Sequence, residues 1–150
     1  MDKDFKRIID FLDEHHVLSL ATNGDDGVSV CNLFYAFDKD THSFVVASSE
    51  DTLHVKHTFQ NSNIAGTVVL ETKTVGKIQG LQFRGEFLHP KSTSSHSLTA
   101  HVEDEGLKKL YFKTFPYALA MNPKLWQIKV NYFKLTDNRL GFGKKIVYTI

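Results

Sequence analysis

Short apolar segments, each closed by a turn signal, run through most of this chain and restrict its fold more than any other feature. The clearest pair, residues 17–22 and 28–37, flanks residues 23–27 (NGDDG), where Asn, Asp and Gly favour a tight hairpin. Because these strands are not each followed by a helix, the pattern predicts a mainly β protein, an antiparallel barrel or sandwich with peripheral helices. Further strands are expected at 43–48, 64–70, 81–88, 125–135 and 146–150.

Three helices are expected around these strands. Phe5, Ile8, Ile9 and Leu12 follow the spacing of one helix face, which predicts a helix over 4–15. Segments 50–60 and 97–115 read as a short and a longer helix, the first capped by Ser48 or Ser49 and the second ended by Pro116.

Length and composition narrow the class of protein. A chain of 150 residues with 41% hydrophobic residues is expected to form one domain over 1–150 with a core of its own. The net charge of +1 favours neither nucleic acid nor an anionic membrane as partner. A single cysteine, no signal-peptide pattern and no apolar run of membrane-spanning length together predict a cytoplasmic protein.

Residues 136–145 (TDNRLGFGKK) raise the question of a nucleotide-binding loop. A Rossmann fingerprint needs a third glycine and a following helix, whereas a strand pattern follows here. A P-loop fails as well, because Lys145 stands where Ser or Thr belongs. The stretch therefore predicts a turn at Asp137 and Asn138, with Asn138 tolerating a positive φ, and glycines at a bulge or close approach.

Two further candidates are weaker. Glu50, His54 and His57 have a spacing that could hold a metal on one helix face, but nothing in the sequence identifies another ligand, so no metal site is predicted. Cys31 has no neighbour that would activate a nucleophile, and a partly buried structural role is expected for it.

The order of the elements, and the stretches VCNLFYAFD, SSEDTLHVKH, GLQFRGE and TDNRLGFGKK, carry a family resemblance that covers nearly the whole chain. They resemble the FMN-binding split barrels typified by pyridoxamine 5'-phosphate oxidase, and within them the YhbP-type bacterial proteins. The resemblance implies a split β-barrel, a homodimer, and FMN bound in a cleft at the subunit interface.

The resemblance also implies which residues would hold the cofactor. The phosphate would lie after the third strand, where Thr52 keeps a hydroxyl, Leu53 replaces an arginine and His54 stands in the place of a lysine. Ser48 would meet the phosphate or ribityl chain. The ring would lie beside the second strand and touch a glutamine. Gln82 is preferred to Gln79 for this contact, and the side chain of Gln82 points the same way as that of Arg84. The implied set is Asn32, Leu33, Phe34, Ser48, Thr52, His54, His57 and Gln82.

Glu50 and Asp51 oppose a phosphate at this helix start. A carboxylate about 4 Å from a phosphate oxygen would repel it by roughly 4 kcal/mol, whereas at about 10 Å in water the cost falls to about 0.4 kcal/mol. FMN binding therefore requires both carboxylates to face solvent.

The functional expectation is an FMN-dependent oxidoreductase in which no catalytic residue is assigned. Two alternatives stand beside it. One is a non-enzymatic split barrel whose altered site holds haem, another ligand or nothing; the other is a detoxifying flavin reductase with loose substrate demands.

Overall fold

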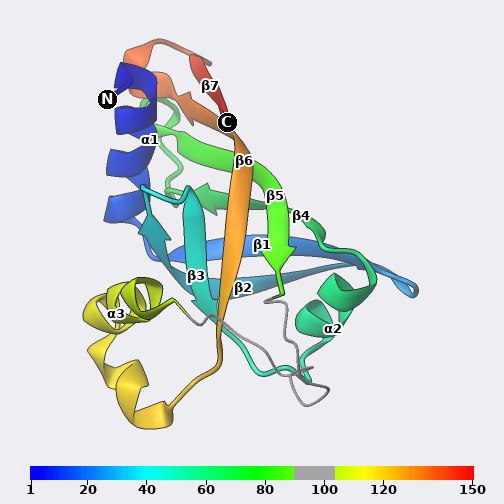
Figure 1. The fold of residues 1–150 in the computed structure, drawn as a ribbon. Helices are drawn as coiled ribbons and strands as arrows, with labels where there is room; N and C mark the ends of the chain where they lie inside the picture. Colours follow the sequence, from blue (N-terminus) through cyan, green and yellow to red (C-terminus); the bar gives the residue numbers. More distant parts are fainter. Residues whose placement is uncertain (90–103) are drawn as a thin grey trace.

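The computed structural model describes residues 1–89 and 104–150 (Figure 1). Within these ranges it contains seven strands, three α-helices and short 3₁₀ turns at Val75–Lys77, Pro116–Met121 and Asn138–Leu140. The helices are α1 (Lys3–Glu14), α2 (Leu53–Gln60) and α3 (Glu105–Thr114). The strands are β1 (Val17–Gly24), β2 (Gly27–Asp38), β3 (Ser43–Ala47), β4 (Asn63–Val69), β5 (Gln79–Leu88), β6 (Leu125–Asp137) and β7 (Lys145–Thr149).

The strands form one antiparallel sheet in the order β3-β2-β1-β4-β5-β6-β7. β3 also pairs with β6, from Ser43 opposite Lys129 to Ala47 opposite Leu125, so that the sheet closes on itself and β7 extends beyond the closed part. This arrangement confirms the mainly β, antiparallel barrel with peripheral helices that the strand pattern predicts.

The strand β6 belongs to both parts of the sheet because it changes partners along its length. Residues 125–129 pair with β3, and residues 132–136 pair with β7. The register of the β5–β6 pairing shifts at this point: Arg84 lies opposite Tyr132 and Gly85 opposite Val130, so Asn131 has no partner on β5. Gly85 is needed there, since a Cβ at this position would collide with the backbone carbonyl of Lys129.

The core fills the barrel with aromatic and branched side chains, and the apolar face of α1 is buried in it. Asp2 caps α1 by accepting hydrogen bonds from the N–H groups of Asp4 and Phe5 (2.8 and 3.0 Å). Both chain ends lie in the upper part of the view, the N-terminus at α1 and the C-terminus at the end of β7, whereas α2 lies near the tip of the β1–β2 hairpin (Figure 1). The largest fully buried side chains include Trp126, Tyr35, Phe44, Phe83, Phe87 and Phe133.

The start of α2 differs from the prediction. The N-cap residue is Thr52, neither Ser48 nor Ser49, and the helix begins at Leu53, so residues 50–52 precede it. The two serine hydroxyls are engaged elsewhere: Ser48 contacts His54, and Ser49 donates to Asp51. In α3, the part of the predicted helix at 97–103 lies outside the described residues, and Asp104 is the N-cap in extended conformation.

The 136–145 stretch forms the connection between β6 and β7. Asn138 does not adopt the positive φ expected of it; Gly141 (φ 134°) and Gly143 (φ 70°) do. Asn138 instead holds the loop with its side chain, which donates to the carbonyl of Val75 (2.8 Å) and accepts from the N–H of Gly143 (3.0 Å). The glycines therefore serve chain reversal. The close approach expected at them is not found, because a Cβ at Gly141 or Gly143 would meet no other atom within 4 Å.

None of the helices in the described part of the chain combines the length and the apolar character that crossing a bilayer requires.

Candidate functional site

Ser48, Thr52 and His54 lie together where β3 leads into α2. The His54 Nε2 atom is 2.5 Å from the Ser48 hydroxyl and 3.3 Å from that of Thr52. Ser48 is itself held in place, because its N–H donates to the carbonyl of Lys124 (3.0 Å) and its carbonyl accepts from the indole of Trp126 (2.8 Å). Two hydroxyls and an imidazole thus converge beside a helix N-terminus.

The electrostatics of this cluster favour a neutral imidazole in the ligand-free protein. Burial lowers the pKa of His54, and His57 nearby lowers it further. Thr52 makes no side-chain cap bond to α2, so among the described residues no side chain caps the first-turn N–H groups of this helix. An anion here would meet hydroxyl donors, these N–H groups and a ring able to gain a proton.

The two acids at this position have other partners. Glu50 forms an ion pair with Lys124 (2.6 Å), and its second carboxylate oxygen is buried without a hydrogen-bond partner among the described residues. Asp51 is exposed, and the hydrogen bond from Ser49 lowers the pKa of its carboxyl group. Asp51 thus faces solvent, as a phosphate site would require. Glu50 does not, because it is partly buried against Lys124, which offsets its charge.

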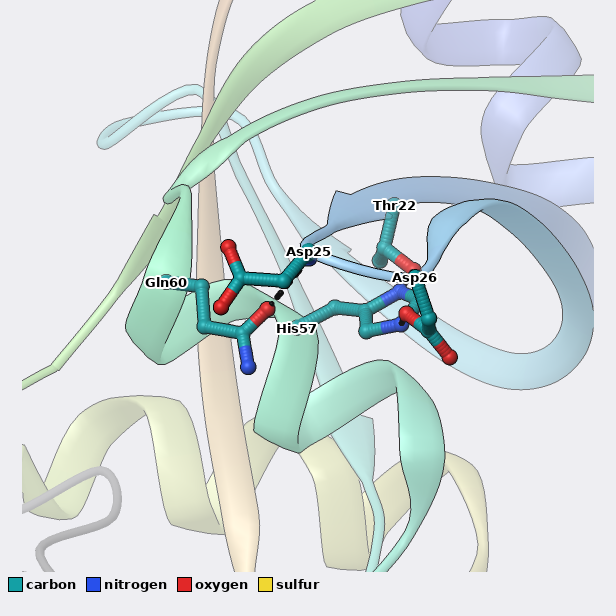
Figure 2. A network of polar contacts seen from close by, with 5 residues as sticks. All are labelled: Thr22, Asp25, Asp26, His57 and Gln60. Carbon is teal, nitrogen blue, oxygen red and sulfur yellow. Dashed lines mark hydrogen bonds and ion pairs between the residues drawn. The ribbon is translucent and has the colours of Figure 1, made fainter.

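His57 faces away from this cluster and contacts the β1–β2 hairpin. Figure 2 shows its ring between Thr22 and Asp26, with Nδ1 2.9 Å from the Thr22 hydroxyl and Nε2 2.6 Å from the Asp26 carboxylate. Both ring nitrogens therefore have partners within the chain. The three residues considered for a metal site have separate partners: Glu50 pairs with Lys124, His54 with Ser48, and His57 with Asp26. The described residues contain no group of three or more acidic, His or Cys side chains placed to hold a metal.

A second set of polar side chains crosses the outer face of the barrel in a single row. Asn32 pairs with Ser19, Ser19 with Thr67, Thr67 with Gln82, and Gln82 with Lys134. Because neighbouring strands are about 4.8 Å apart, Asn32 and Gln82 are separated by roughly 14 Å along the sheet. We call Asn32, Ser19, Thr67, Gln82 and Lys134 the polar row.

A parallel row lies two residues further along each strand. Val30 pairs with Ala21, Ala21 with Ala65, Ala65 with Arg84, and Arg84 with Tyr132. We call these five residues the Arg84 row. It combines small and apolar side chains with one cation at its β5 position.

The Arg84 row and the middle of the polar row, without Asn32 and Lys134, line a surface groove of about 510 Å³. Gln82 and Arg84 both line it, which confirms that they point the same way, whereas Gln79 is buried. Ser48, Thr52 and His54 are not among its lining residues. The predicted site residues therefore fall into two groups: the cluster at the start of α2 and the outer face with Asn32 and Gln82.

The three residues predicted on β2 face different ways. Asn32 is exposed and accepts a hydrogen bond from the Ser19 hydroxyl (2.8 Å). Leu33 packs against the core, and Phe34 is 61% exposed with its ring 5.5 Å from that of Phe115. Cys31 is partly buried against the core, as expected, and burial raises the pKa of its thiol.

Ser19 and Thr67 line the groove, and sequence reasoning did not single them out. Each is an ordinary strand residue, and its place in the groove depends on pairing between distant strands. The alternation of Gln82 and Arg84 on β5 was the one local signal of a polar outer face.

The same outer face carries exposed apolar side chains at its margin. Val17, Phe34 and Val69 lie beyond the polar row, and Val28 lies beyond the Arg84 row. Exposed apolar residues gathered on one face, as opposed to scattered singly, are typical of an interaction surface.

Comparisons with known proteins identify the family. No family model matches the chain. A protein of Klebsiella pneumoniae named UPF0306 protein is 35% identical over 136 residues, which cover 91% of this chain and 86% of that protein. This chain belongs to the UPF0306 family. A second UPF0306 relative, YhbP of Escherichia coli O127:H6, is 33% identical over 138 residues and 92% of each chain, which confirms the YhbP-type resemblance.

Solved structures similar to this UPF0306 chain share its fold at low identity. A heme binding protein from Mycobacterium smegmatis superposes with a TM-score of 0.75 at 12% identity, over 99% of this chain and 59% of that one. A Clostridium acetobutylicum protein of the pyridoxinephosphate oxidase family gives 0.63 at 16%, over 100% and 97%. A FAD-binding protein from Mesorhizobium loti gives 0.63 at 14%, over 90% and 94%. The fold is therefore a split barrel of the pyridoxamine 5'-phosphate oxidase type, as expected.

Proposed function

We propose that this UPF0306 protein binds FMN and acts as a flavin-dependent oxidoreductase. The observation that carries the proposal is the convergence of Ser48, Thr52 and His54 beside the N-terminus of α2. Hydroxyl donors, uncapped helix N–H groups and a histidine suit a phosphate group. Structures of this fold include proteins described as FAD-binding and as members of the pyridoxinephosphate oxidase family, which supports a flavin as ligand.

The nearby acids do not exclude a phosphate. Asp51 is exposed, and a carboxylate about 10 Å from the phosphate in water would cost only about 0.4 kcal/mol. Lys124 pairs with Glu50 and offsets its charge. His57 is left out of the proposed phosphate site, because both of its ring nitrogens already have partners.

Asn32 and Gln82 would hold the flavin ring, with the backbone of Leu33 and Phe34 alongside. When bound, the flavin supplies the hydride or electron chemistry, and the protein contributes binding, orientation and hydrogen bonds to the ring. Ser48 would hold the ribityl or phosphate end. The electron donor and substrate would have to approach from the outer face, where the groove lies.

We further propose a cytoplasmic homodimer with the cofactor cleft at its interface. The exposed apolar side chains around the groove support a second copy as the partner of this face. The free, partly buried thiol of Cys31 fits a reducing compartment such as the cytoplasm.

The test is a calorimetric titration of ligand-free protein with FMN and, separately, with riboflavin, which lacks the phosphate. We expect saturable binding of about one FMN per chain, and much weaker binding of riboflavin. His54→Gln should weaken FMN binding by about ten- to a hundredfold, the value of a charge-assisted hydrogen bond, and leave riboflavin binding unchanged. Ser48→Ala should weaken FMN binding to a similar extent, and its effect on riboflavin tells whether the hydroxyl binds the phosphate (no change) or the ribityl chain (the same loss). His16→Gln, at an exposed histidine outside the cluster, is the matched control.

The alternative is a non-enzymatic binding protein, favoured by the similarity to a heme binding protein of the same fold. Failure to bind FMN together with saturable binding of haem would replace the flavin proposal by this one. If FMN binds but no nicotinamide donor reduces it, the protein would be a flavin carrier and not a reductase.

A further inference from the structure

Arg84 points outward from β5 into the groove, where its guanidinium group is held in a defined orientation. The guanidinium carbon lies 4.0 Å from the ring centroid of Tyr132, its cross-strand neighbour on β6. Such cation–π contact orients the planar group while leaving its N–H donors free to bind a ligand.

The charge of Arg84 is not balanced within the described residues. No carboxylate there lies within ion-pairing distance of it, and Arg84 is the one charged residue that lines the groove. Glu86, the next outward residue on β5, lies near the Ser62 hydroxyl (3.4 Å). The Arg84 guanidinium, which can donate two parallel hydrogen bonds, therefore faces the groove without an acidic partner among the described residues.

The shape of the groove adds a second requirement. Its floor consists of small side chains, Ser19, Ala21, Ala65 and Thr67, with Val30 at one margin. A volume of about 510 Å³ is within the range of small-molecule sites. A flat, mostly apolar floor suits a planar organic body, and the guanidinium at its edge suits a carboxylate.

We propose that the groove binds a small planar organic anion, an aromatic or conjugated carboxylate, with its carboxylate on Arg84 and its ring over Ala21 and Ala65. As the substrate class of the enzyme, this inference rests on the proposed flavin function, because the Arg84 row lies beside the polar row assigned to the flavin ring. As a binding site it stands without FMN.

The test uses FMN-free protein, so that failure of the flavin proposal does not affect its result. Benzoate and benzamide, which share a shape and differ in charge, are titrated while the backbone amides of Thr67 and Gln82 are followed by NMR. We expect saturable binding that favours benzoate in the wild type. Arg84→Gln should weaken benzoate by about ten- to a hundredfold and leave benzamide unchanged.

Two further variants sharpen the result. Arg84→Lys keeps the charge but loses the planar fork, and should retain part of the preference for benzoate. Lys73→Gln removes an exposed charge outside the groove, and should change neither ligand.

Equal binding of benzoate and benzamide by the wild type would overturn the proposal, as would a preference that persists in Arg84→Gln. If benzoate does not bind and Arg84→Gln dissociates a dimer, then Arg84 pairs with a second copy of the chain and the anion site does not exist.

Discussion

The imidazole of His57 joins two parts of the chain that are 31 residues apart, through a 2.6 Å contact between its Nε2 atom and the carboxylate of Asp26. The histidine is 2% exposed, whereas the Asp26 side chain is 66% exposed. On the other side of the ring, Thr22 is 1% exposed. Thr22, His57 and Asp26 have the composition of a hydrolase triad. However, the Thr22 hydroxyl, which would have to act as nucleophile, is buried, whereas the Asp26 carboxylate is exposed. The three residues therefore form a clamp between α2 and the hairpin.

The clamp positions the helix that carries His54, and its removal should cost stability. His57→Ala leaves the Thr22 hydroxyl buried without a partner and a cavity beside it, for which we expect a loss of about 2–4 kcal/mol. Asp26→Asn should cost under about 1 kcal/mol because the acid is exposed. Unfolding in urea measures both.

Asp25→Ala is the matched control for the clamp. Gln60 accepts its hydrogen bond from the backbone N–H of Asp25, so this bond survives the substitution (Figure 2). Equal destabilisation by Asp25→Ala and Asp26→Asn would mean that the hairpin tip contributes through its general charge and not through His57.

A charge introduced at the exposed residue Val69 should disrupt the proposed dimer. It is 65% exposed and lies two residues beyond Thr67 on the outer face, so that Val69→Glu would place a charge in an apolar interface. We expect this variant to be monomeric by light scattering while its fold is kept. Val75→Glu, at a comparably exposed valine in a 3₁₀ turn outside the sheet, should leave the dimer intact. A dimer that persists in Val69→Glu would exclude this face.

The sequence predicted the elements well where the signal was local. The NGDDG hairpin closes with Gly24 opposite Gly27, and Gly27 takes a φ of 113° that favours glycine. The start of α2 was wrong, because the choice among several hydroxyl residues depended on where distant partners lie: Trp126 and Lys124 fix Ser48 and thereby place its hydroxyl against His54.

The candidate site was predicted unevenly for the same reason. The family resemblance put Ser48, Thr52 and His54 into one set, and these three residues do lie together, although their role is still a prediction. His57 lies on the same helix as His54, but its contacts are with a hairpin 31 residues earlier. The groove arises from cross-strand register between β1, β4 and β5, and local periodicity contains no information on which strands become neighbours.

The buried carboxylate of Asp137 provides a test of the β6–β7 turn. Arg139 donates to it twice through its side chain (3.0 and 2.8 Å), and these bonds are the main reason why the pKa of Asp137 is lowered. Arg139→Met should cost about 1–3 kcal/mol near neutral pH, because the carboxylate is 3% exposed and loses its charged partner. Lys6→Met, which breaks the exposed pair with Asp10, should cost about 0.5 kcal/mol or less.

The acid dependence of this pair has a definite sign. A carboxyl group with a lowered folded-state pKa stabilises the fold above its unfolded value, about 3.9, and loses that stabilisation as the pH falls through the folded value. The difference in stability between the wild type and Arg139→Met should therefore shrink as the pH falls below about 4. A difference that stays constant down to about pH 2 would mean that Arg139 acts through packing alone.

Protonation of His54 on FMN binding provides a test of the proposed phosphate site. Burial lowers the pKa of His54, so the ring is neutral near pH 7 and disfavours protonation in the folded protein. Its contribution to stability is present above about 6.5, the unfolded value, and is lost as the pH falls through the lowered value. A phosphate dianion beside the ring would raise this pKa, so FMN binding at about pH 6.5–7 should take up protons.

Calorimetry in buffers of different ionisation enthalpy measures this uptake. We expect net uptake of a fraction of a proton per FMN in the wild type, no change with riboflavin, and release instead of uptake for His54→Gln. The ionisation of the phosphate itself has the opposite effect, because a group with a pKa of about 6 near positive charge releases protons on binding. Uptake that is unchanged in His54→Gln would exclude His54 as the phosphate partner, even if FMN binds tightly.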